Sequence, residues 1–321
     1  HLSIRRQRQM CIRDSFLSNP VAKPPCRMIN AQMYGFFVSG CEQKMQYYVD
    51  ATLNLLATES TSFNVLGSTC LLTFTDIEKI SSLTPPFSEH GWMQETDIII
   101  WLPVAKMQDG DISHLYWYPA FISVNNIYAL INGREAWGYN KYLCEYQMPT
   151  AVSDAGAFSI SLECFDVFNP DSKLAMHELL TIEQTQASTK ENLLDNLSQF
   201  SKHVTDLFDA QINGIDLSLL KQLLDGFIHP QMDQILFKQF PDGQGDKAVY
   251  QSVVHSPSLI KKIHQLKLLH NDFSLDVKAL ASFPLNDMFG IALGKQAVHL
   301  PFYVNMDFDQ LGATQLLPAQ G

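Results

Sequence analysis

The stretch INGREAWGYNKYL, residues 131–143, places one lysine, Lys141, among apolar, aromatic and glycine residues. A free lysine amine has a pKa of roughly 10.4 and is almost entirely charged at neutral pH. Burial among apolar side chains, here those of Trp137, Tyr139 and Tyr142, disfavours the ammonium form and can lower this pKa to about 5–6. Lys141 is therefore either a surface residue with its ammonium in water or an amine kept neutral to act as a nucleophile. The residues alone favour the surface position.

The segments around this stretch have the composition of β-strands. Residues 96–106, TDIIIWLPVAK, and 112–124, ISHLYWYPAFISV, are rich in the β-branched and aromatic residues that favour strands. The turn signal Asp109-Gly110-Asp111 joins them, so we expect a hairpin. Residues 125–138 are typical of a short helix that ends at glycines. Further strands are expected at 34–50, 66–76 and 157–168, and again around Gln234, Val254, 266–269 and Val277.

A helical segment interrupts these strands at about 185–228. Ser188 and Glu191 form a capping-box pattern, and apolar residues then recur at helical spacing as far as Phe208. Asp216 begins a second helix, which Gly226 ends. The order of strands, two helices and strands again predicts a mostly-β (α+β) fold rather than alternating βαβ units.

The two ends of the chain are expected to lie outside the main domain. Residues 1–15, HLSIRRQRQMCIRDS, lack the apolar run and cleavage site of a secretory signal and resemble a translated sequencing adaptor. We interpret residues 16–33, which include three prolines, as a loose lead, and residues 309–321 as a polar tail. A single domain is then expected over 34–308.

The charge of the chain argues against several classes of partner. The formal net charge is −11, and it becomes −14 once the four arginines and one aspartate of residues 1–15 are set aside. Nucleic acids and anionic membranes both require clustered cations, and Lys261-Lys262 is the only basic pair left in the sequence. The longest apolar run, 98–104, is too short to span a bilayer. We therefore expect neither nucleic acid nor a membrane as a partner.

Five cysteines remain without Cys11, and neither they nor the histidines have the spacing of a metal site. The cysteines form no CxxC pair and their number is odd, so reduced thiols in a cytoplasmic protein fit better than disulfides. No histidine pair has HxH or HxxxH spacing, and the sequence has no GxGxxG, phosphate-loop or GxSxG motif. We expect no metal.

Residues 132–143, NGREAWGYNKYL, resemble the signature of the acetoacetate decarboxylase family, roughly G-R-E-x-x-x-[YF]-P-K-K-L. The matching residues are Gly133, Arg134, Glu135, Tyr139, Lys141 and Leu143. The two strands before the signature, the segment 230–246 and the segment SFPLNDM at 282–288 agree with the family in order and spacing. The resemblance covers roughly 34–308.

The resemblance implies a fold and a chemistry. The fold is a mostly antiparallel, acetoacetate decarboxylase-like β-barrel or cone with a pocket running into it. Lys141 takes the position of the family's nucleophilic lysine, which forms a Schiff base with a ketone. The protonated imine withdraws electrons, carbon dioxide leaves acetoacetate, and the enamine is protonated and hydrolysed to acetone. The resemblance further implies a small keto-acid substrate, no metal or organic cofactor, and a homo-oligomer.

The sequence departs from the family at three places. Tyr142 replaces the second lysine, so desolvation alone has to lower the pKa of Lys141. Asn140 replaces the proline before the lysine. The family's carboxylate-binding arginine has no match, because Arg27 lies outside the matched segment and Arg134 belongs to the signature itself.

The family's acidic pocket residue precedes the first of the two strands by a few positions. Ungapped spacing back from Pro103 points to Asp97, and Glu95 is the alternative if the register slips by two. An acid beside the imine acts as a general acid or base. A solvent-exposed residue at the start of a strand is the other interpretation of Asp97, and Glu135 either lines the pocket or pairs with Arg134. The expected pocket consists of Lys141, Asp97, Glu95, Glu135, Arg134, Tyr142, Trp137 and Tyr139.

Three functions remain open. The first is the decarboxylation of a β-keto acid such as acetoacetate through Lys141. The second is an aldolase-dehydratase reaction of the same lysine imine on pyruvate and aldehydes, because family relatives that lack the arginine resemble such enzymes. The third is a barrel that binds a small ligand without turnover, and the loss of the paired lysine keeps this reading open.

Overall fold

The computed structural model describes residues 22–150, 156–186, 202, 231–269 and 272–320. Residues 1–15 and nearly all of the helical segment expected at 185–228 lie outside this part of the chain. No helix within it is long and apolar enough to cross a bilayer.

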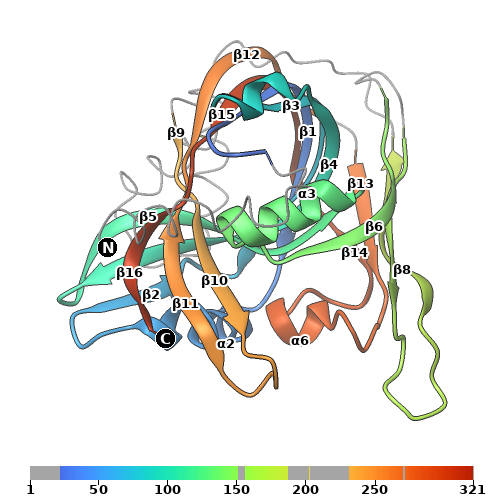
Figure 1. Cartoon of the computed structure of the whole chain (residues 1–321). Helices are drawn as coiled ribbons and strands as arrows, with labels where there is room; N and C mark the ends of the chain where they lie inside the picture. The colour runs from blue at the N-terminus through green and yellow to red at the C-terminus, as the bar shows by residue number, and fades with distance from the viewer. Residues whose placement is uncertain (1–21, 151–155, 187–201, 203–230, 270–271, 321) are drawn as a thin grey trace, which may run out of the picture.

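Most of the described chain belongs to one large mixed β-sheet (Figure 1). Its strands follow the order β14-β13-β8-β7-β6-β5-β4-β3-β1-β15-β12-β9, and β2 pairs with β4. A smaller sheet has the order β10-β11-β16. The bounds in the large sheet are β1 Cys26–Ser39, β2 Thr61–Val65, β3 Thr69–Ser82, β4 Met93–Gln108, β5 Asp111–Val124, β6 Lys141–Gln147, β7 Phe158–Cys164, β8 Ala175–Gln186, β9 Gln231–Met232, β12 Ser258–Leu268, β13 Asp272–Val277, β14 Gly294–Ala297 and β15 His299–Gln310. Those in the small sheet are β10 Ile235–Pro241, β11 Ala248–His255 and β16 Thr314–Gln320.

Short helices connect the strands. Two of them, α2 and α6, pack against each other, and Lys44 Nζ in α2 donates a hydrogen bond to the carbonyl of Asn286 in α6 (2.9 Å). Another pair, α3 followed by the single turn η4, links β5 to β6. The bounds are α2 Glu42–Asp50, η2 Leu53–Leu56, η3 Phe87–Glu89, α3 Ile127–Asn132, η4 Gly133–Trp137 and α6 Leu285–Phe289.

The expected hairpin of residues 96–106 and 112–124 is confirmed as β4 and β5, which pair antiparallel from Asp97 opposite Val124 to Gln108 opposite Asp111. The strands expected at 66–76 and 157–168 correspond to β3 and β7, and the short helix to α3 and η4.

The structure differs from expectation near both ends of the described chain. The lead expected at 16–33 is strand from Cys26 onward, and the tail expected at 309–321 contains β16. The second half of the strand expected at 34–50 is the helix α2. Its buried residues, Met45 and Val49, lie four apart, which is the spacing of one helix face and not of a strand.

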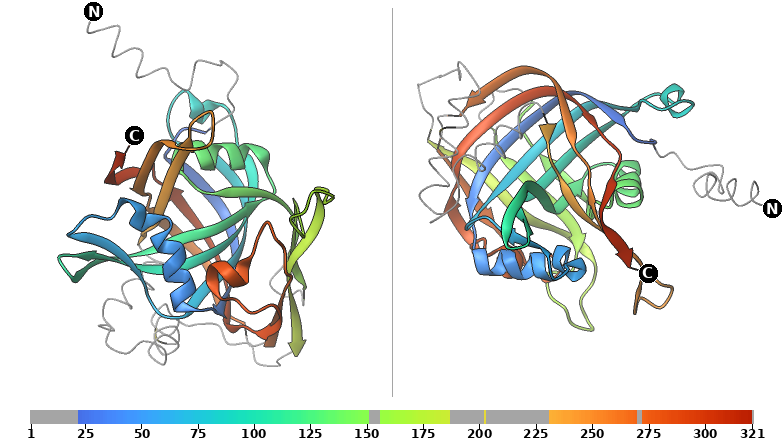
Figure 2. Two further views of the ribbon diagram at one scale, coloured as in Figure 1. Left: turned by 90° about the horizontal axis from the view of Figure 1, so that it is seen from below. Right: turned by 90° about the vertical axis from the view of Figure 1, so that its left-hand side faces the viewer.

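β4 is buried on both faces, which explains its continuous apolar sequence. Ile98 and Ile100 point into one core cluster, whereas Ile99 and Trp101 point into a second cluster on the opposite face. Figure 2 shows that β12, β15, β1, β3 and β4 curve strongly. The face with the second cluster is the enclosed one, because Ile99 and Trp101 line a cavity there.

An irregularity in β1 and β3 decides which side chains face this second cluster. The pairing of β1 with β15 shifts between Met28 and Ala31, and the pairing of β3 with β4 shifts between Ile77 and Ile80. Asn30 has a φ of 52°, a left-handed conformation that asparagine tolerates better than most residues. Each shift corresponds to one extra residue in the strand. Met28 therefore lies on the same face as Ala31, three positions later, and Ile80 lies on the same face as Ile77.

Candidate active site

Lys141 begins β6 and points into the enclosed face of the large sheet. β5 and β6 run parallel, so that Lys141 pairs with Ile122. Successive side chains of a strand point to opposite faces. Lys141 is accordingly only 7% exposed, while Tyr142 packs against Phe121 and Phe283 on the other face. Tyr142, expected in the pocket, therefore does not line it.

Two residues of the signature stretch position the side chain and the backbone of Lys141. A Cβ on Gly133 would lie 2.7 Å from both Cδ and Cε of Lys141, so only glycine leaves room for this side chain. Arg134 Nη1 donates hydrogen bonds to the carbonyl oxygen of Lys141 (3.2 Å) and to Asn140 Oδ1 (2.9 Å). Arg134 thus holds the backbone at Lys141 rather than facing its amine.

The amine of Lys141 lies between two carboxyl groups. Nζ donates one hydrogen bond to Glu95 Oε1 and another to Asp97 Oδ1 at 3.1 Å. Glu95 and Asp97 are two residues apart in β4 and therefore share a face. The centroid of the Tyr139 ring lies 5.5 Å from Nζ. The structure therefore brings both acid candidates to the lysine, where the spacing argument had chosen Asp97 ahead of Glu95.

These groups line a cavity of about 90 Å³, measured as the space open to the centres of water-sized spheres. One water molecule needs about 10–15 Å³ on that measure, so the cavity has room for a small organic molecule. Trp137 and Tyr139, two of the expected pocket residues, belong to the lining. Much of the remaining lining is apolar and includes Met28, Met33, Met93, Met232 and Met306.

Two other expected pocket residues lie elsewhere. Arg134 and Glu135 are exposed and line a separate hollow of the surface, together with Asn140 and one side of Tyr139. They follow Gly133 in the turn η4, which directs their side chains away from Lys141. The signature therefore contributes its lysine, its glycine and two aromatic residues to the cavity.

Burial and neighbouring charges set the protonation of the site. Burial alone would lower the pKa of Lys141, but Asp97 and Glu95 outweigh it and raise this pKa above its ordinary value. The lowering expected from the sequence is therefore wrong for the free protein, because the sequence does not show two carboxyl groups beside the amine. Burial, with the nearby charge of Asp97 as the second cause, raises the pKa of Glu95 to about 8. Glu95 consequently gains or loses its proton close to neutral pH.

Two polar atoms of the lining make no hydrogen bond within the described part of the protein. They are Thr75 Oγ1 and Asn132 Oδ1, and both are buried. Thr75 is the cross-strand neighbour of Asp97, and Asn132 directly precedes Gly133. A buried polar atom without a partner costs free energy, so these two atoms are places where a bound molecule gains hydrogen bonds. Sequence reasoning missed them, because neither belongs to a motif.

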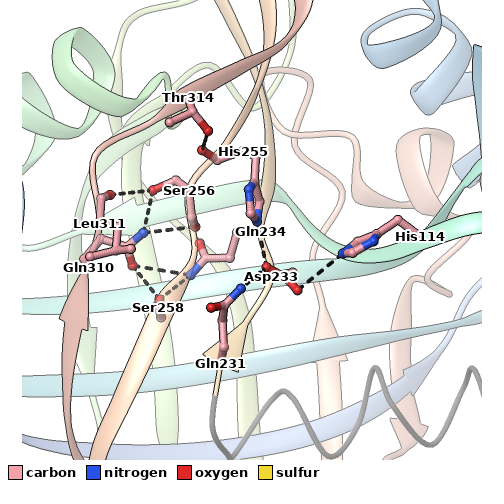
Figure 3. A network of polar contacts seen from close by, with 10 residues as sticks. All are labelled: His114, Gln231, Asp233, Gln234, His255, Ser256, Ser258, Gln310, Leu311 and Thr314. Atoms are coloured by element: carbon pink, nitrogen blue, oxygen red, sulfur yellow. Dashed lines mark hydrogen bonds and ion pairs between the residues drawn. The ribbon is translucent and has the colours of Figure 1, made fainter.

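A chain of uncharged polar side chains joins four residues of the lining to Ser256, and Figure 3 shows this chain from Gln234 onward. The Tyr139 hydroxyl donates to Gln234 Oε1 (2.8 Å), and Gln234 Nε2 donates to Ser258 Oγ (2.6 Å). Ser258 Oγ then donates to Gln310 Oε1 (2.5 Å), and Gln310 Nε2 donates to Ser256 Oγ (2.7 Å). Apart from Tyr139, no sequence motif indicated these residues, because only the folding of the sheet brings residues 139, 234, 256, 258 and 310 together.

Asp233 lies beside this chain, outside the cavity, between two histidines (Figure 3). Its Oδ1 is 2.7 Å from His255 Nε2, and its Oδ2 is 3.5 Å from His114 Nε2. Burial would raise the pKa of Asp233, but the hydrogen bonds from the histidines hold it below its ordinary range. No set of three or more His, Cys, Asp or Glu residues in the described ranges is placed to hold a metal ion.

Lys141 is the only positively charged side chain among the described residues that line the cavity. Arg27 lies in β1 between two lining residues, Cys26 and Met28, but points to the opposite face. There its Nε donates to Asp309 Oδ1 at 2.9 Å. A substrate carboxylate therefore finds no arginine in this part of the lining.

Comparison with known proteins identifies solved structures that have a similar fold. No protein-family model and no curated protein matches the sequence. Acetoacetate decarboxylase from Legionella pneumophila subsp. pneumophila str. Philadelphia 1 matches in structure with a TM-score of 0.58 and 11% identity, over 92% of this chain and 88% of that chain. Another acetoacetate decarboxylase structure matches with a TM-score of 0.58 and 14% identity, over 95% of each chain. An acetoacetate decarboxylase-like enzyme from Sphingomonas wittichii RW1 matches with a TM-score of 0.52 and 12% identity, over 92% and 94%.

The expected fold class is thereby confirmed: the chain has the mostly-β fold of the acetoacetate decarboxylase-like enzymes. At these identities the likeness shows the fold alone, so the chemistry has to be argued from the site.

Proposed function

We propose that this protein is a Schiff-base lyase in which Lys141 forms an imine with a small ketone, and that its reaction is the decarboxylation of a β-keto acid such as acetoacetate. The observation that carries the proposal is the position of Lys141 Nζ, which contacts both Glu95 and Asp97 inside a largely apolar cavity. Such an amine has a proton acceptor within reach and is shielded from bulk water, and both conditions favour imine formation.

The nucleophile arises by proton transfer from Lys141 to Glu95. The two acids keep Lys141 protonated in the free protein, so the amine has to lose a proton before it attacks. Glu95 accepts a hydrogen bond from Nζ, and because burial raises its pKa, its ionised form is a stronger base than an exposed carboxylate. Asp97 remains as the charge that balances the iminium ion.

The reaction then follows from the imine. The neutral amine attacks the ketone carbon, and the carbonyl oxygen leaves as water with one proton from the attacking nitrogen and one returned by Glu95. The iminium accepts the electron pair of the bond between the α-carbon and the carboxylate, so that carbon dioxide leaves and an enamine remains. Protonation of the enamine carbon and hydrolysis release the ketone and restore Lys141. One proton replaces the carbon dioxide, and no electron acceptor is needed.

The character of the cavity supports the loss of a carboxylate. A carboxylate that enters an apolar cavity loses hydration, and close to Asp97 it also meets a like charge. Departure of carbon dioxide removes both penalties. The enamine that remains is neutral, and protonation of its carbon restores the cation of the imine opposite Asp97 before hydrolysis.

An aldolase-dehydratase reaction is the second candidate, because family relatives without the carboxylate-binding arginine resemble such enzymes. The described lining of this cavity likewise has no arginine. Aldol chemistry uses the same lysine, but its enamine attacks an aldehyde and releases no carbon dioxide. Pyruvate together with an aldehyde is the substrate pair that tests it.

Release of carbon dioxide from acetoacetate tests the first candidate against the second. We expect the wild-type protein to release carbon dioxide and the Lys141→Ala variant to lose at least about 10²-fold in rate, because the variant cannot form the imine. Lys106→Ala is the matched control, since Lys106 lies in β4 but outside the lining. Equal rates for Lys141→Ala and wild type would eliminate the imine mechanism. Condensation of pyruvate with an aldehyde, without release of carbon dioxide from acetoacetate, would favour the second candidate.

A further inference from the structure

We propose that the substrate of the Lys141 site is a β-keto acid with an extended alkyl tail, of the size of 3-oxohexanoate or 3-oxooctanoate, rather than acetoacetate. The inference rests on the proposed function and adds to it the recognition of the carbon chain. Its basis is a row of apolar side chains that lies across four strands of the sheet and begins two residues from Glu95.

Four apolar side chains lie side by side across four strands. Met93 in β4 pairs with Ile80 in β3, Ile80 pairs with Met28 in β1, and Met28 pairs with Phe308 in β15. All four line the cavity, and we refer to them as the apolar row. The extra residue in β1 and β3 turns Met28 and Ile80 toward the cavity, because a shift by one residue moves a side chain to the other face.

The apolar row begins at Met93, close to the reactive groups along β4. Met93 lies two residues before Glu95 in β4, which corresponds to about 6.8 Å along the strand. An alkyl chain of a few methylene groups, attached to the imine carbon, spans this distance. Acetoacetate has only a methyl group on that side of its ketone and leaves the apolar row without a ligand.

Three of the four residues of the apolar row are partly open to solvent. Met28, Met93 and Phe308 are half-buried and Ile80 is 3% exposed, whereas at the reactive end Lys141 and Glu95 are 7% and 4% exposed and Asp97 is half-buried. The amine and Glu95 thus lie in a buried part of the lining, and most of the apolar row lies in a partly exposed part. A longer tail lies along the apolar row and does not have to fit entirely within the 90 Å³ cavity.

Methionine side chains make this surface adaptable. Five of the eleven methionines of the chain line the cavity, and two of them, Met28 and Met93, belong to the apolar row. An unbranched thioether side chain rearranges at low cost and accommodates apolar ligands of different lengths. The lining therefore suits a flexible alkyl tail better than a single fixed methyl group.

A chain-length series tests the inference on the full-length protein. Carbon dioxide release is measured with acetoacetate, 3-oxohexanoate and 3-oxooctanoate, each corrected for spontaneous decarboxylation. We expect kcat/KM to rise about twofold to fourfold for each added methylene group, the factor that partial to complete burial of a methylene supplies. A parallel borohydride reduction with each keto acid shows whether Lys141 forms the imine.

Two variants locate the effect in the apolar row. Met93→Gln keeps the length of the side chain but makes it polar, and we expect it to flatten the dependence of kcat/KM on chain length. Met107→Gln changes a half-buried methionine of the same strand outside the lining, and the dependence should persist. An unchanged dependence in Met93→Gln would contradict the role of the apolar row.

The outcomes separate the inference from the proposed function. A flat or falling kcat/KM with increasing chain length, together with an acetoacetate adduct on Lys141, would overturn the extended tail and leave the imine mechanism standing. The absence of an adduct with all three keto acids would overturn both.

Discussion

One ammonium group, that of Lys141, shares a buried space with the carboxyl groups of Glu95 and Asp97. Buried charges persist only when partners of opposite sign compensate them, and removal of one partner leaves an uncompensated charge. Nζ of Lys141 contacts both carboxyl groups, so the three side chains form one charged cluster. Glu95 is the member that changes its protonation near neutral pH.

This arrangement predicts how activity depends on pH. Below about pH 8 Glu95 already carries a proton and cannot accept one from Lys141, so we expect kcat/KM to fall up to about tenfold per pH unit as the pH drops. Glu95→Gln removes the acceptor, and it should lower kcat by about 10²-fold or more and abolish this dependence. Rate profiles between about pH 5.5 and 9 measure both effects.

Two further variants serve as comparisons for Glu95→Gln. Glu145→Gln changes an exposed carboxyl group in the strand of Lys141 and should keep the wild-type profile. Asp97→Asn should slow the reaction less than Glu95→Gln, because Glu95 is the more deeply buried acid and the one with a pKa near neutrality. A larger loss in Asp97→Asn, or an unchanged pH dependence in Glu95→Gln, would contradict the assignment of Glu95 as the base.

Among the elements, the segment from α3 to β6 directs the lysine into the cavity. Asn126 caps α3 by accepting a hydrogen bond from the backbone N–H of Tyr128 (2.9 Å). Gly138 ends the turn η4 with a φ of 94°, a conformation that glycine adopts without strain, so that β6 starts at Lys141. The parallel pairing with β5 then fixes the direction of the strand.

Gly133→Ala tests this positioning. Gly133 has φ −60° and ψ −45°, which alanine adopts easily, so the variant should fold. Its new Cβ would lie 2.7 Å from the Lys141 side chain and displace the amine, and a shift of about 1 Å can cost about 10²-fold in rate. We expect kcat to fall by about that factor while the melting temperature changes little. Gly243→Ala, where no atom lies within 4 Å of the added Cβ, is the control, and full activity of Gly133→Ala would refute the steric argument.

Local sequence patterns predicted the elements whose residues interact with near neighbours. β4 and β5 have continuous apolar and aromatic sequences and are joined by an Asp-Gly turn, so their hairpin was predictable. The start of β1 at Cys26 and the strand β16 were missed, because each depends on a partner remote in sequence. Cys26 pairs with Gln310, and His255 in β11 pairs with Thr314 in β16.

Over the whole molecule, the order of strands in the sheet assembles the cavity. Its lining extends in sequence from Cys26 to Gln310, and the curved strands bring these residues to one face (Figure 2). The resemblance of the signature stretch pointed to Lys141, and spacing along one strand pointed to Asp97 or Glu95. No such pattern indicated Thr75, because its place beside Asp97 follows from the pairing of β3 with β4. The hydrogen-bonded chain from Gln234 to Gln310 could not be predicted either, because the fold of the whole chain brings its residues together.

Reduction with borohydride detects an imine at Lys141 directly. The full-length protein is incubated with acetoacetate or pyruvate, reduced, weighed intact and digested to map the modified peptide. We expect a mass increase that corresponds to one reduced ketone on the peptide containing Lys141, and no increase in the Lys141→Ala variant. No adduct with either ketone, or an adduct confined to other lysines, would contradict the imine mechanism.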